Sequence, residues 1–233
     1  MHIREWRPDE YTAIESRGLV LSYAAILAHR GNVWFAVDPV TDSEYVVKAL
    51  EKGDRELFIL PWLLDHPALR NVVLPAEIIT CEKSCLIIMP RLIPGTDLLF
   101  ASHTPKHMTV MLHGFAGLIE CVEVLHRNNI AHMDIDNENF VYADRDISFG
   151  SHFIKKGSVY LIDFGATRRF DSGPGTNVII HDYKEAGGHY RPPEGKDAVD
   201  PYAYDIYSIG VNLKLCWEVS TVICQLYETL QLQ

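Results

Sequence analysis

The hydrophobic pattern of the first ninety or so residues predicts a series of short strands. Between residues 19 and 50, apolar runs are separated by polar segments at 30–32 and 38–43, which is typical of antiparallel strands joined by hairpins. Residues 72–79 and 84–89 show two further runs of this kind. Ahead of them, the polar and mixed composition of residues 1–18 predicts a loose arm.

A helical period replaces the strand pattern in the second half of the chain. Within 109–127, apolar residues recur at three- and four-residue intervals, which predicts a long amphipathic helix. A shorter helix is expected at 55–64, where Pro61 should end or kink it early. The Pro94-Gly95 pair within 90–96 predicts a connection between a β-rich unit and a mainly helical one. The fold class is therefore α+β.

Two acidic segments carry the candidate chemistry. The first is His132-Met133-Asp134-Ile135-Asp136-Asn137-Glu138-Asn139, and the second is Asp163-Phe164-Gly165 directly after an apolar strand at 159–162. Carboxylate and amide oxygens are the hard ligands that magnesium prefers beside phosphate oxygens. Two unrelated turns are the plain alternative, because Asp and Asn are ordinary loop residues. The two segments in this order predict a magnesium–phosphate site.

These motifs resemble those of the eukaryotic protein kinase family, and three further landmarks follow in family order. Lys48 lies in a strand-like run at 44–50, Tyr190-Arg191-Pro192-Pro193-Glu194 resembles the end of an activation segment, and 205–210 resembles the start of the large central helix. The resemblance extends from about residue 19 to about residue 215. It implies an arm at 1–18, a small antiparallel β lobe at 19–92, and a mainly helical lobe at 93–233. That second lobe is expected to be incomplete, because it stops about one helix past the activation segment.

The resemblance also implies roles for individual residues. Asp134 would accept a hydroxyl proton, Lys48 would contact the α- and β-phosphates of ATP, and Asn139 and Asp163 would hold magnesium. The nucleotide would also contact Gly31, Val33, Val46, Met89 and the backbone of Arg91 and Leu92. The expected structural residues are Glu56 as the partner of Lys48, together with His132, Phe164, Glu194 and Asp205.

Two departures from the family pattern concern the phosphate-covering loop and activation. Gly31 is the only glycine expected in that loop, where Ile26 and Ala28 take the other glycine positions, so the loop should fit phosphate poorly. Met133 replaces the arginine that pairs with a phosphorylated activation-segment residue. Phosphorylation should therefore not switch this chain by that route.

The largest departure is Asp136, which replaces the lysine that touches the γ-phosphate in serine/threonine kinases. A carboxylate about 5 Å from a phosphate oxygen repels it by roughly 3 kcal/mol at an effective dielectric constant of about 20. Gly187 replaces the threonine that bonds this lysine in the family, so the two changes can be correlated. Arg168 or Arg169 could supply the missing positive charge.

Composition narrows the classes of partner. The net charge is −10 with no long basic run, so a nucleic-acid partner is not expected. The five cysteines are irregularly spaced, which favours reduced thiols over a zinc site. No signal peptide and no run of about 18 apolar residues is visible, which predicts an intracellular chain, cytoplasmic or nuclear, without a membrane span. Residues 144–156 exceed what a tight turn needs and predict an inserted, exposed hairpin.

Three functions fit these observations. The first is a protein kinase that transfers phosphate from Mg-ATP to a serine or threonine of an unspecified protein. The second is a pseudokinase that serves as a nucleotide-binding or interaction module, favoured by Asp136 and the poor glycine loop. The third is a small-molecule kinase, which shares Asp134 and Asn139 but lacks segments like 190–194 and 205–210.

Overall fold

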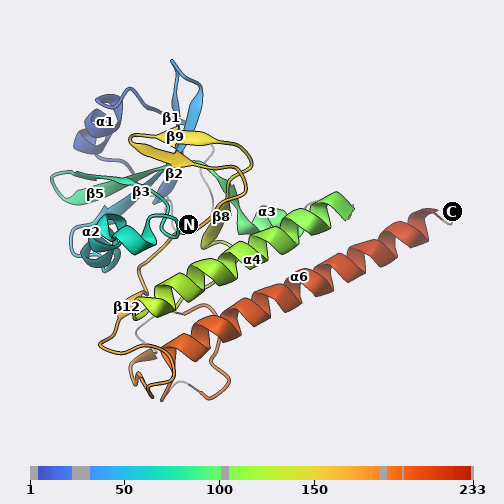
Figure 1. Ribbon diagram of the computed structural model, residues 1–233. Helices are drawn as coiled ribbons and strands as arrows, with labels where there is room; N and C mark the ends of the chain where they lie inside the picture. The colour runs from blue at the N-terminus through green and yellow to red at the C-terminus, as the bar shows by residue number, and fades with distance from the viewer. Residues whose placement is uncertain (1–4, 23–31, 101–104, 184–187, 196, 232–233) are drawn as a thin grey trace.

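The computed structural model describes residues 5–22, 32–100, 105–183, 188–195 and 197–231 of the 233-residue chain. Its small lobe is an antiparallel sheet of five strands in the order β1-β2-β3-β5-β4 (Figure 1). The strands are β1 Val20–Ser22, β2 Val33–Asp38, β3 Ser43–Glu51, β4 Glu77–Thr80 and β5 Ser84–Pro90. The alternation seen in the sequence buries one face, where Ala36, Val47, Ala49, Leu86 and Ile88 pack together.

The strand expected at 72–79 begins only at Glu77. Val72, Val73 and Leu74 are buried, but they bond to the large lobe: the Leu161 N–H donates to the Val72 carbonyl at 2.7 Å, and the Leu74 N–H donates to the Leu161 carbonyl at 3.3 Å. An apolar run can pair with either lobe, and the sequence pattern does not distinguish the two. This segment therefore ties the lobes together.

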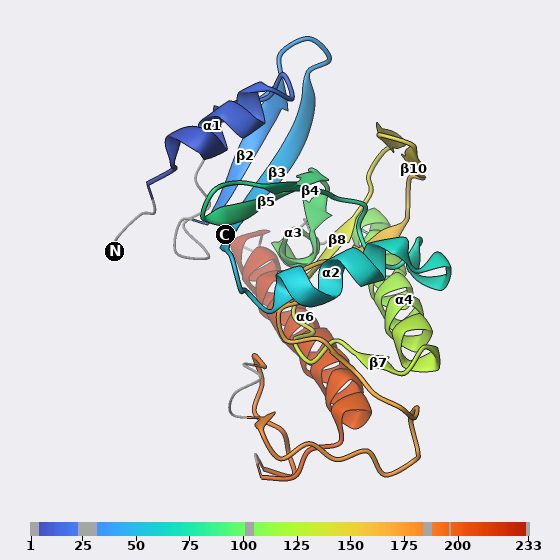
Figure 2. The same cartoon turned by 90° about the vertical axis from the view of Figure 1, so that its left-hand side faces the viewer.

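The expectation of a loose N-terminal arm is wrong for the described part of residues 1–18. Helix α1, Pro8–Glu15, packs against the outer part of the sheet (Figure 2). Ile14 is 1% exposed, and the ring of Trp6 meets the ring of Trp34 edge-on at 5.8 Å. A few apolar residues are enough to hold α1 on the sheet because polar side chains of the helix, such as Glu10, also form hydrogen bonds.

Helix α2, Glu56–Asp65, confirms the helix expected at 55–64 but not its early end. It continues through Pro61, although proline removes a backbone donor and costs about 3 kcal/mol in a helix interior. Leu60 and Leu63 on either side are buried in the main core, and this packing outweighs the cost. A single 3-10 turn, η2 Pro67–Leu69, follows.

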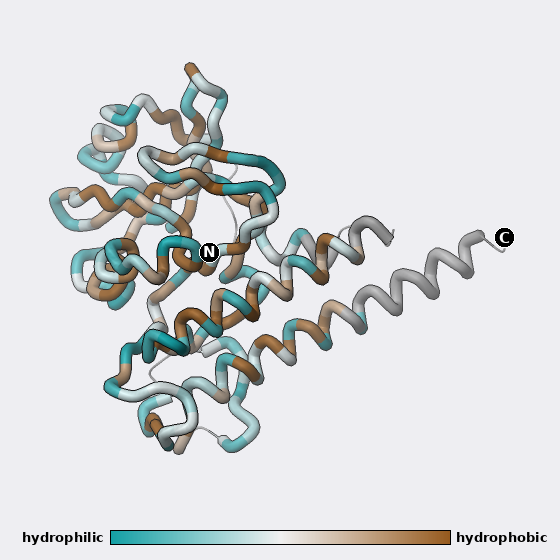
Figure 3. Tube along the Cα trace, in the orientation of Figure 1, coloured by the Kyte–Doolittle hydropathy of each residue, from teal (hydrophilic) through white to brown (hydrophobic). Residues whose placement is uncertain are grey.

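The second lobe is built on two long helices that lie side by side in Figures 1 and 2. They are α4, Pro105–Arg127, and α6, Pro201–Gln231, and a short helix α3, Gly95–Phe100, precedes them. Figure 3 shows hydrophobic residues recurring along α4 and the first part of α6 with hydrophilic residues between them. Helix α6 starts at Pro201, four residues before the motif that suggested it.

Short strands in the second lobe carry the acidic motifs. One sheet has the order β11-β8-β6, from Val159–Leu161, Phe140–Tyr142 and Ile93–Pro94, and a second pairs β12, Arg168–Arg169, with β7, Ile130–Ala131. The first motif runs from the end of β7 to the start of β8, and the second follows β11. Antiparallel pairing of β8 with β11 thus brings the two acidic segments to the same edge.

The hairpin expected at 144–156 is confirmed. Strands β9, Ile147–Phe149, and β10, His152–Ile154, pair in antiparallel fashion. The hairpin rises from the second lobe to the sheet of the first, where the rings of Phe149 and Tyr45 lie 6.2 Å apart.

Among the described residues, one stretch within α4, Met108–Arg127, is long and apolar enough to cross a membrane by length and composition alone. Its Phe115, Leu118, Val122 and Leu125 side chains are buried in the main core. Packing inside the molecule accounts for these four side chains, whereas Leu112 and Ile119 of the same stretch are exposed.

Candidate functional site

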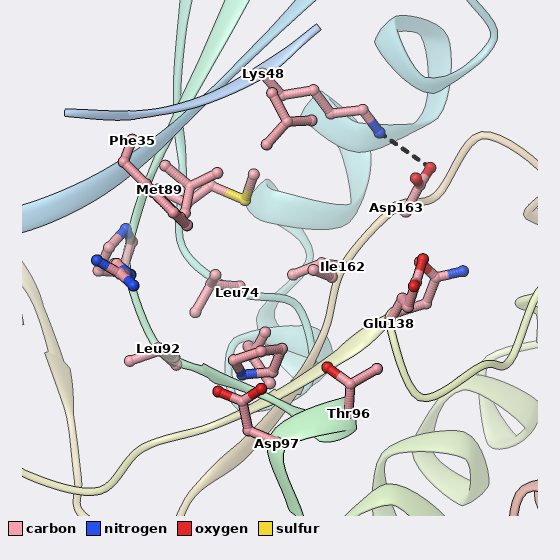
Figure 4. A pocket seen from close by; sticks show the side chains of 17 residues that line it. Phe35, Lys48, Leu74, Met89, Leu92, Thr96, Asp97, Glu138, Ile162 and Asp163 are labelled. Carbon is pink, nitrogen blue, oxygen red and sulfur yellow. Dashed lines mark ion pairs between the residues drawn. The ribbon is translucent and has the colours of Figure 1, made fainter. Parts of the chain in front are cut away.

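A cavity of 390 Å³ lies between the two lobes. Its walls are mainly apolar, and Figure 4 shows Lys48 and Asp163 together at one end with Thr96 and Asp97 at the opposite end. Of the expected nucleotide contacts, the lining includes Val33, Val46, Lys48, Met89, Arg91, Leu92 and Asp163. Gly31 lies outside the described residues. An apolar slot with a few charged groups at its ends is the usual form of a small-ligand site.

Lys48 forms the charged end with two carboxylates from different elements. Its Nζ lies 2.5 Å from Glu56 Oε2 and 3.0 Å from Asp163 Oδ1. Glu56 is placed at the first turn of α2, where its N–H donates to Asp54 Oδ1 at 3.0 Å. The other Glu56 oxygen, Oε1, accepts the N–H of Phe164 at 3.3 Å. One buried carboxylate thus joins strand β3, helix α2 and the segment after β11.

The charge state of Lys48 follows from the same contacts. Burial by itself lowers the pKa of the ammonium, but Glu56 and Asp163 outweigh it and raise the pKa above its usual value. Lys48 therefore stays positively charged at the end of the cavity.

Each acidic segment contains one residue with a left-handed backbone conformation. Asp163 has φ 61° and Met133 has φ 68°, both in the left-handed region that costs non-glycine residues about 1–3 kcal/mol. The Met133 N–H donates to Asp205 Oδ1 at 2.8 Å, and the His132 N–H donates to Asp205 Oδ2 at 2.8 Å. Asp205 is completely buried, and its Oδ2 also lies 3.0 Å from His126 Nε2. Helix α6 thereby holds the strained backbone of the first segment.

Asp134 and Asn139 lie side by side, as their spacing suggested. The Asn139 amide nitrogen donates to the Asp134 carbonyl at 2.8 Å and to Asp134 Oδ2 at 3.1 Å. The other carboxylate oxygen, Oδ1, accepts the N–H of His189 at 3.0 Å. Burial raises the pKa of Asp134 above its usual value, which makes the carboxylate a stronger base.

The remaining expected structural residues are placed as follows. The His132 ring lies 5.1 Å from the Phe164 ring, and both side chains are buried. Glu194 is exposed and forms no ion pair with another described residue. The N–H of Arg91 donates to the Glu44 carbonyl at 3.0 Å, and Arg91 also lines the cavity.

Asp136 has a partner that the sequence did not suggest. It is 8% exposed, and its Oδ2 accepts the hydroxyl of Tyr190 at 2.7 Å. Neither arginine pairs with it: Arg168 binds Asp182 at 2.6 Å, and Arg169 stacks on the ring of Trp62 at 3.7 Å. The sequence suggested an arginine as the partner of Asp136, whereas in the structure its partner is the hydroxyl of Tyr190.

Several lining residues could not be identified from the sequence. Phe35, Leu74, Val141 and Ile162 form apolar walls, and Glu138 and Asp97 add carboxylates, the latter at the end away from Lys48. Phe35 faces the cavity because it pairs with Val46 across the sheet, and the Arg91 guanidinium stacks on its ring at 4.0 Å. The alternation of residues along β3 predicts which of its side chains share a face. The register between β2 and β3, which places Phe35 opposite Val46, could be seen only in the structure.

The donor set fits a magnesium ion bound together with phosphate. Asn139 uses its amide nitrogen on Asp134, which orients its oxygen away from that residue, and Asp163 supplies carboxylate oxygens. In the described ranges, no group of three or more His, Cys, Asp or Glu side chains could hold a metal by itself. Magnesium here would need phosphate oxygens to complete its ligands.

Comparison with known proteins gives one matching family and several distant relatives. The family model described as "Protein kinase domain" matches residues 28–225. Calcium-dependent protein kinase 14 of Arabidopsis thaliana is 26% identical over 166 residues, which cover 70% of this chain and 28% of that protein. The PAS domain-containing serine/threonine-protein kinase of Mus musculus is 25% identical over 225 residues, which cover 86% of this chain and 14% of that protein. The chain thus spans less than a third of the length of either relative.

Proposed function

Since the chain belongs to the protein kinase family, as the match over residues 28–225 shows, we propose that it transfers a phosphoryl group from Mg-ATP to a serine or threonine hydroxyl of a protein. The choice of serine or threonine rests on the relatives, among them a serine/threonine-protein kinase. An intracellular location remains a prediction, and the protein substrate is open.

The observation that carries this proposal is the Lys48–Glu56–Asp163 group at the end of the interlobe cavity. A charged lysine fixed by Glu56 at 2.5 Å is oriented before any ligand arrives. In the proposed site it binds the α- and β-phosphates while the apolar walls hold the base. Bound magnesium would be held by Asp163 and Asn139, and it would neutralise phosphate charge.

The chemical step assigned to the chain's own residues is proton removal. Asp134 would accept the proton of the attacking hydroxyl at Oδ2, while the His189 N–H fixes Oδ1 at 3.0 Å. Asn139 keeps the carboxylate beside the metal position. Positioning and electrostatics, rather than covalent chemistry, supply most of the rate in such reactions.

A pseudokinase is the second candidate, and Asp136 is the observation that favours it. Asp136 replaces the lysine that serine/threonine kinases use on the γ-phosphate, so the chain lacks that positive charge and could bind the nucleotide without transferring phosphate. An active kinase and a pseudokinase would both bind the nucleotide, but only the active kinase would transfer phosphate.

Nucleotide binding is tested by two substitutions that remove opposite charges. Lys48→Met removes the phosphate contact and Asp163→Asn weakens the metal ligand, so each should abolish the stabilisation of the chain by Mg-ATP in thermal unfolding. Lys52→Met is the matched control, because Lys52 is an exposed lysine just beyond β3. It should leave the stabilisation unchanged.

Unchanged Mg-ATP stabilisation in both Lys48→Met and Asp163→Asn would refute the site. Retained binding in the wild type with transfer at background would select the pseudokinase.

A further inference from the structure

Asp136 has both carboxylate oxygens engaged within the protein. Oδ1 accepts the N–H of Glu138 at 3.0 Å, and Oδ2 accepts the Tyr190 hydroxyl at 2.7 Å. Asp136 does not line the interlobe cavity, whereas Glu138 and Asn139 do. The two oxygens of the carboxylate therefore bind within the loop and to the activation segment (residues 163–194).

Tyr190 connects Asp136 to helix α6. Its hydroxyl also lies 3.0 Å from Asn212 Oδ1, and Asn212 is completely buried. The Asn212 amide nitrogen donates to the Ile135 carbonyl at 3.1 Å and to the Ser208 carbonyl at 2.8 Å, which fixes the amide orientation. Its oxygen can then only accept, so the single hydroxyl hydrogen of Tyr190 is held between two acceptors.

The residue before Tyr190 contacts the other carboxylate of the same loop. The His189 N–H donates to Asp134 Oδ1 at 3.0 Å, so two adjacent residues bind Asp134 and Asp136. The His189 ring is 60% exposed, and its Nε2 lies 3.8 Å from Asp136 Oδ2. Movement of Tyr190 would therefore move the donor that orients Asp134.

The backbone around this pair leaves little room for adjustment. A Cβ at Gly188 would lie 2.6 Å from Tyr204 Oη and 2.9 Å from the Met133 carbonyl oxygen. The Tyr190 carbonyl accepts the Tyr204 hydroxyl at 2.7 Å and also that of Tyr183. Unmodified tyrosines thus hold this stretch on the loop without the arginine that Met133 replaces.

We propose that Asp136 and Tyr190 are positioning residues, which act with Asn212 to hold the His189 N–H against Asp134 and so orient the base of the reaction. The role in the reaction rests on the proposed function, whereas the hydrogen-bonded tether itself does not. Displacement of a reacting group by about 1 Å can cost around a hundredfold in rate, so a tether of this kind has a large effect without touching ATP.

A double-mutant cycle in kcat tests the reaction role. Tyr190→Phe removes the hydroxyl, and Asp136→Ala removes its acceptor together with the acceptor of the Glu138 N–H. Each should lower kcat by about tenfold or more with KM for ATP unchanged. The double variant should be no slower than the slower single variant, because both substitutions break one tether. Asp136→Asn keeps an acceptor oxygen and should retain kcat to within about threefold.

Tyr202→Phe is the matched control. Its hydroxyl donates to the Ser172 carbonyl at 2.8 Å, so the substitution also removes one tyrosine hydrogen bond near the start of α6, but away from Asp136. Tyr202→Phe should leave kcat near the wild-type value. Combined with Asp136→Ala, its small effect on kcat should be independent, so that the two fold-changes multiply.

Amide hydrogen exchange measures the tether without turnover. Tyr190→Phe and Asp136→Ala should each accelerate exchange of the backbone at 134–137, a range that leaves out the Glu138 N–H bound by Asp136 itself. The double variant should exchange there no faster than the faster single variant, and Tyr202→Phe should leave the exchange unchanged. Hydrogen exchange shows whether the tether exists even if the wild type transfers no phosphate. A wild type without transfer would refute the proposed function but not the tether.

Unchanged exchange at 134–137 in Tyr190→Phe would overturn the tether. The positioning role would be overturned if Asp136→Ala showed faster exchange but a kcat equal to or above the wild-type value. It would also be overturned if the losses in kcat of the two single variants multiplied in the double variant.

Discussion

At the scale of single residues, the sequence motifs identified side chains that the fold brings together. Lys48, Glu56 and Asp163 meet within 3.0 Å, and Asp134 meets Asn139 within 3.1 Å. Motif spacing is informative for such residues because each sits at a fixed point of a strand, helix or tight loop. The Asp136–Tyr190 contact could not be inferred, because 54 residues separate the two and no local pattern links them.

The contact with Tyr190 reverses the expected effect of placing a lysine at position 136. If Asp136 faced the γ-phosphate, Asp136→Lys would replace repulsion with attraction and raise transfer by roughly ten- to a hundredfold. Asp136 instead accepts the Tyr190 hydroxyl at 2.7 Å, and a lysine offers no acceptor. We expect Asp136→Lys to lower the initial rate of phosphoryl transfer by about tenfold or more.

The control for this change is Asp144→Lys, which makes the same charge reversal at an exposed loop residue. Its rate should stay near the wild-type value. A faster Asp136→Lys enzyme would show that electrostatic repulsion at the phosphate, and not the tether, limits the wild type.

At the scale of elements, helix α1 shows why the N-terminal segment was misjudged. Its polar residues looked solvent-exposed, but Glu10 is completely buried. Glu10 Oε2 accepts the Arg7 N–H at 2.9 Å, and Oε1 accepts the hydroxyl of Ser84 on β5. Hydrophobic periodicity does not report such packing, because a polar partner 74 residues away satisfies the buried carboxylate.

Glu10→Ala should therefore destabilise the chain. The substitution leaves the buried Ser84 hydroxyl without its acceptor, which costs about 1–3 kcal/mol in the free energy of unfolding. Urea denaturation measures this loss, and Glu15→Ala on the same helix is the control because Glu15 is exposed. Equal unfolding free energies for the two variants would show that α1 does not contribute to stability through Glu10.

In two other elements the local sequence pattern was partly wrong, once about the end of a helix and once about the start of a strand. Pro61 correctly marks a missing backbone donor, but core packing of Leu60 and Leu63 carries α2 on to Asp65. The apolar residues 72–74 have strand character, yet they pair with Leu161 and not with the sheet. In both cases tertiary contacts outweigh the local preference.

At the scale of the whole molecule, the order of landmarks along the chain was enough to predict two lobes of α+β class. The family match over residues 28–225 supports that fold class. The details between the lobes were not predictable, because the cavity walls depend on strand register and on residues from both halves. Phe35 and Asp97 are examples, since each becomes a lining residue only when β2 and the segment after β6 face each other.

The most direct test of the account compares phosphoryl transfer by the wild type and Asp134→Asn under matched Mg-ATP binding. Asp134 contacts Asn139 and the His189 N–H but does not line the cavity, so Asp134→Asn should keep the thermal stabilisation by Mg-ATP. Loss of a positioned base should slow transfer of labelled γ-phosphate to a protein acceptor by about a hundred- to ten-thousandfold. Equal transfer rates in the two proteins, or a wild type that binds Mg-ATP and transfers nothing, would contradict the assignment of this chain as a protein kinase that uses Asp134 as its base.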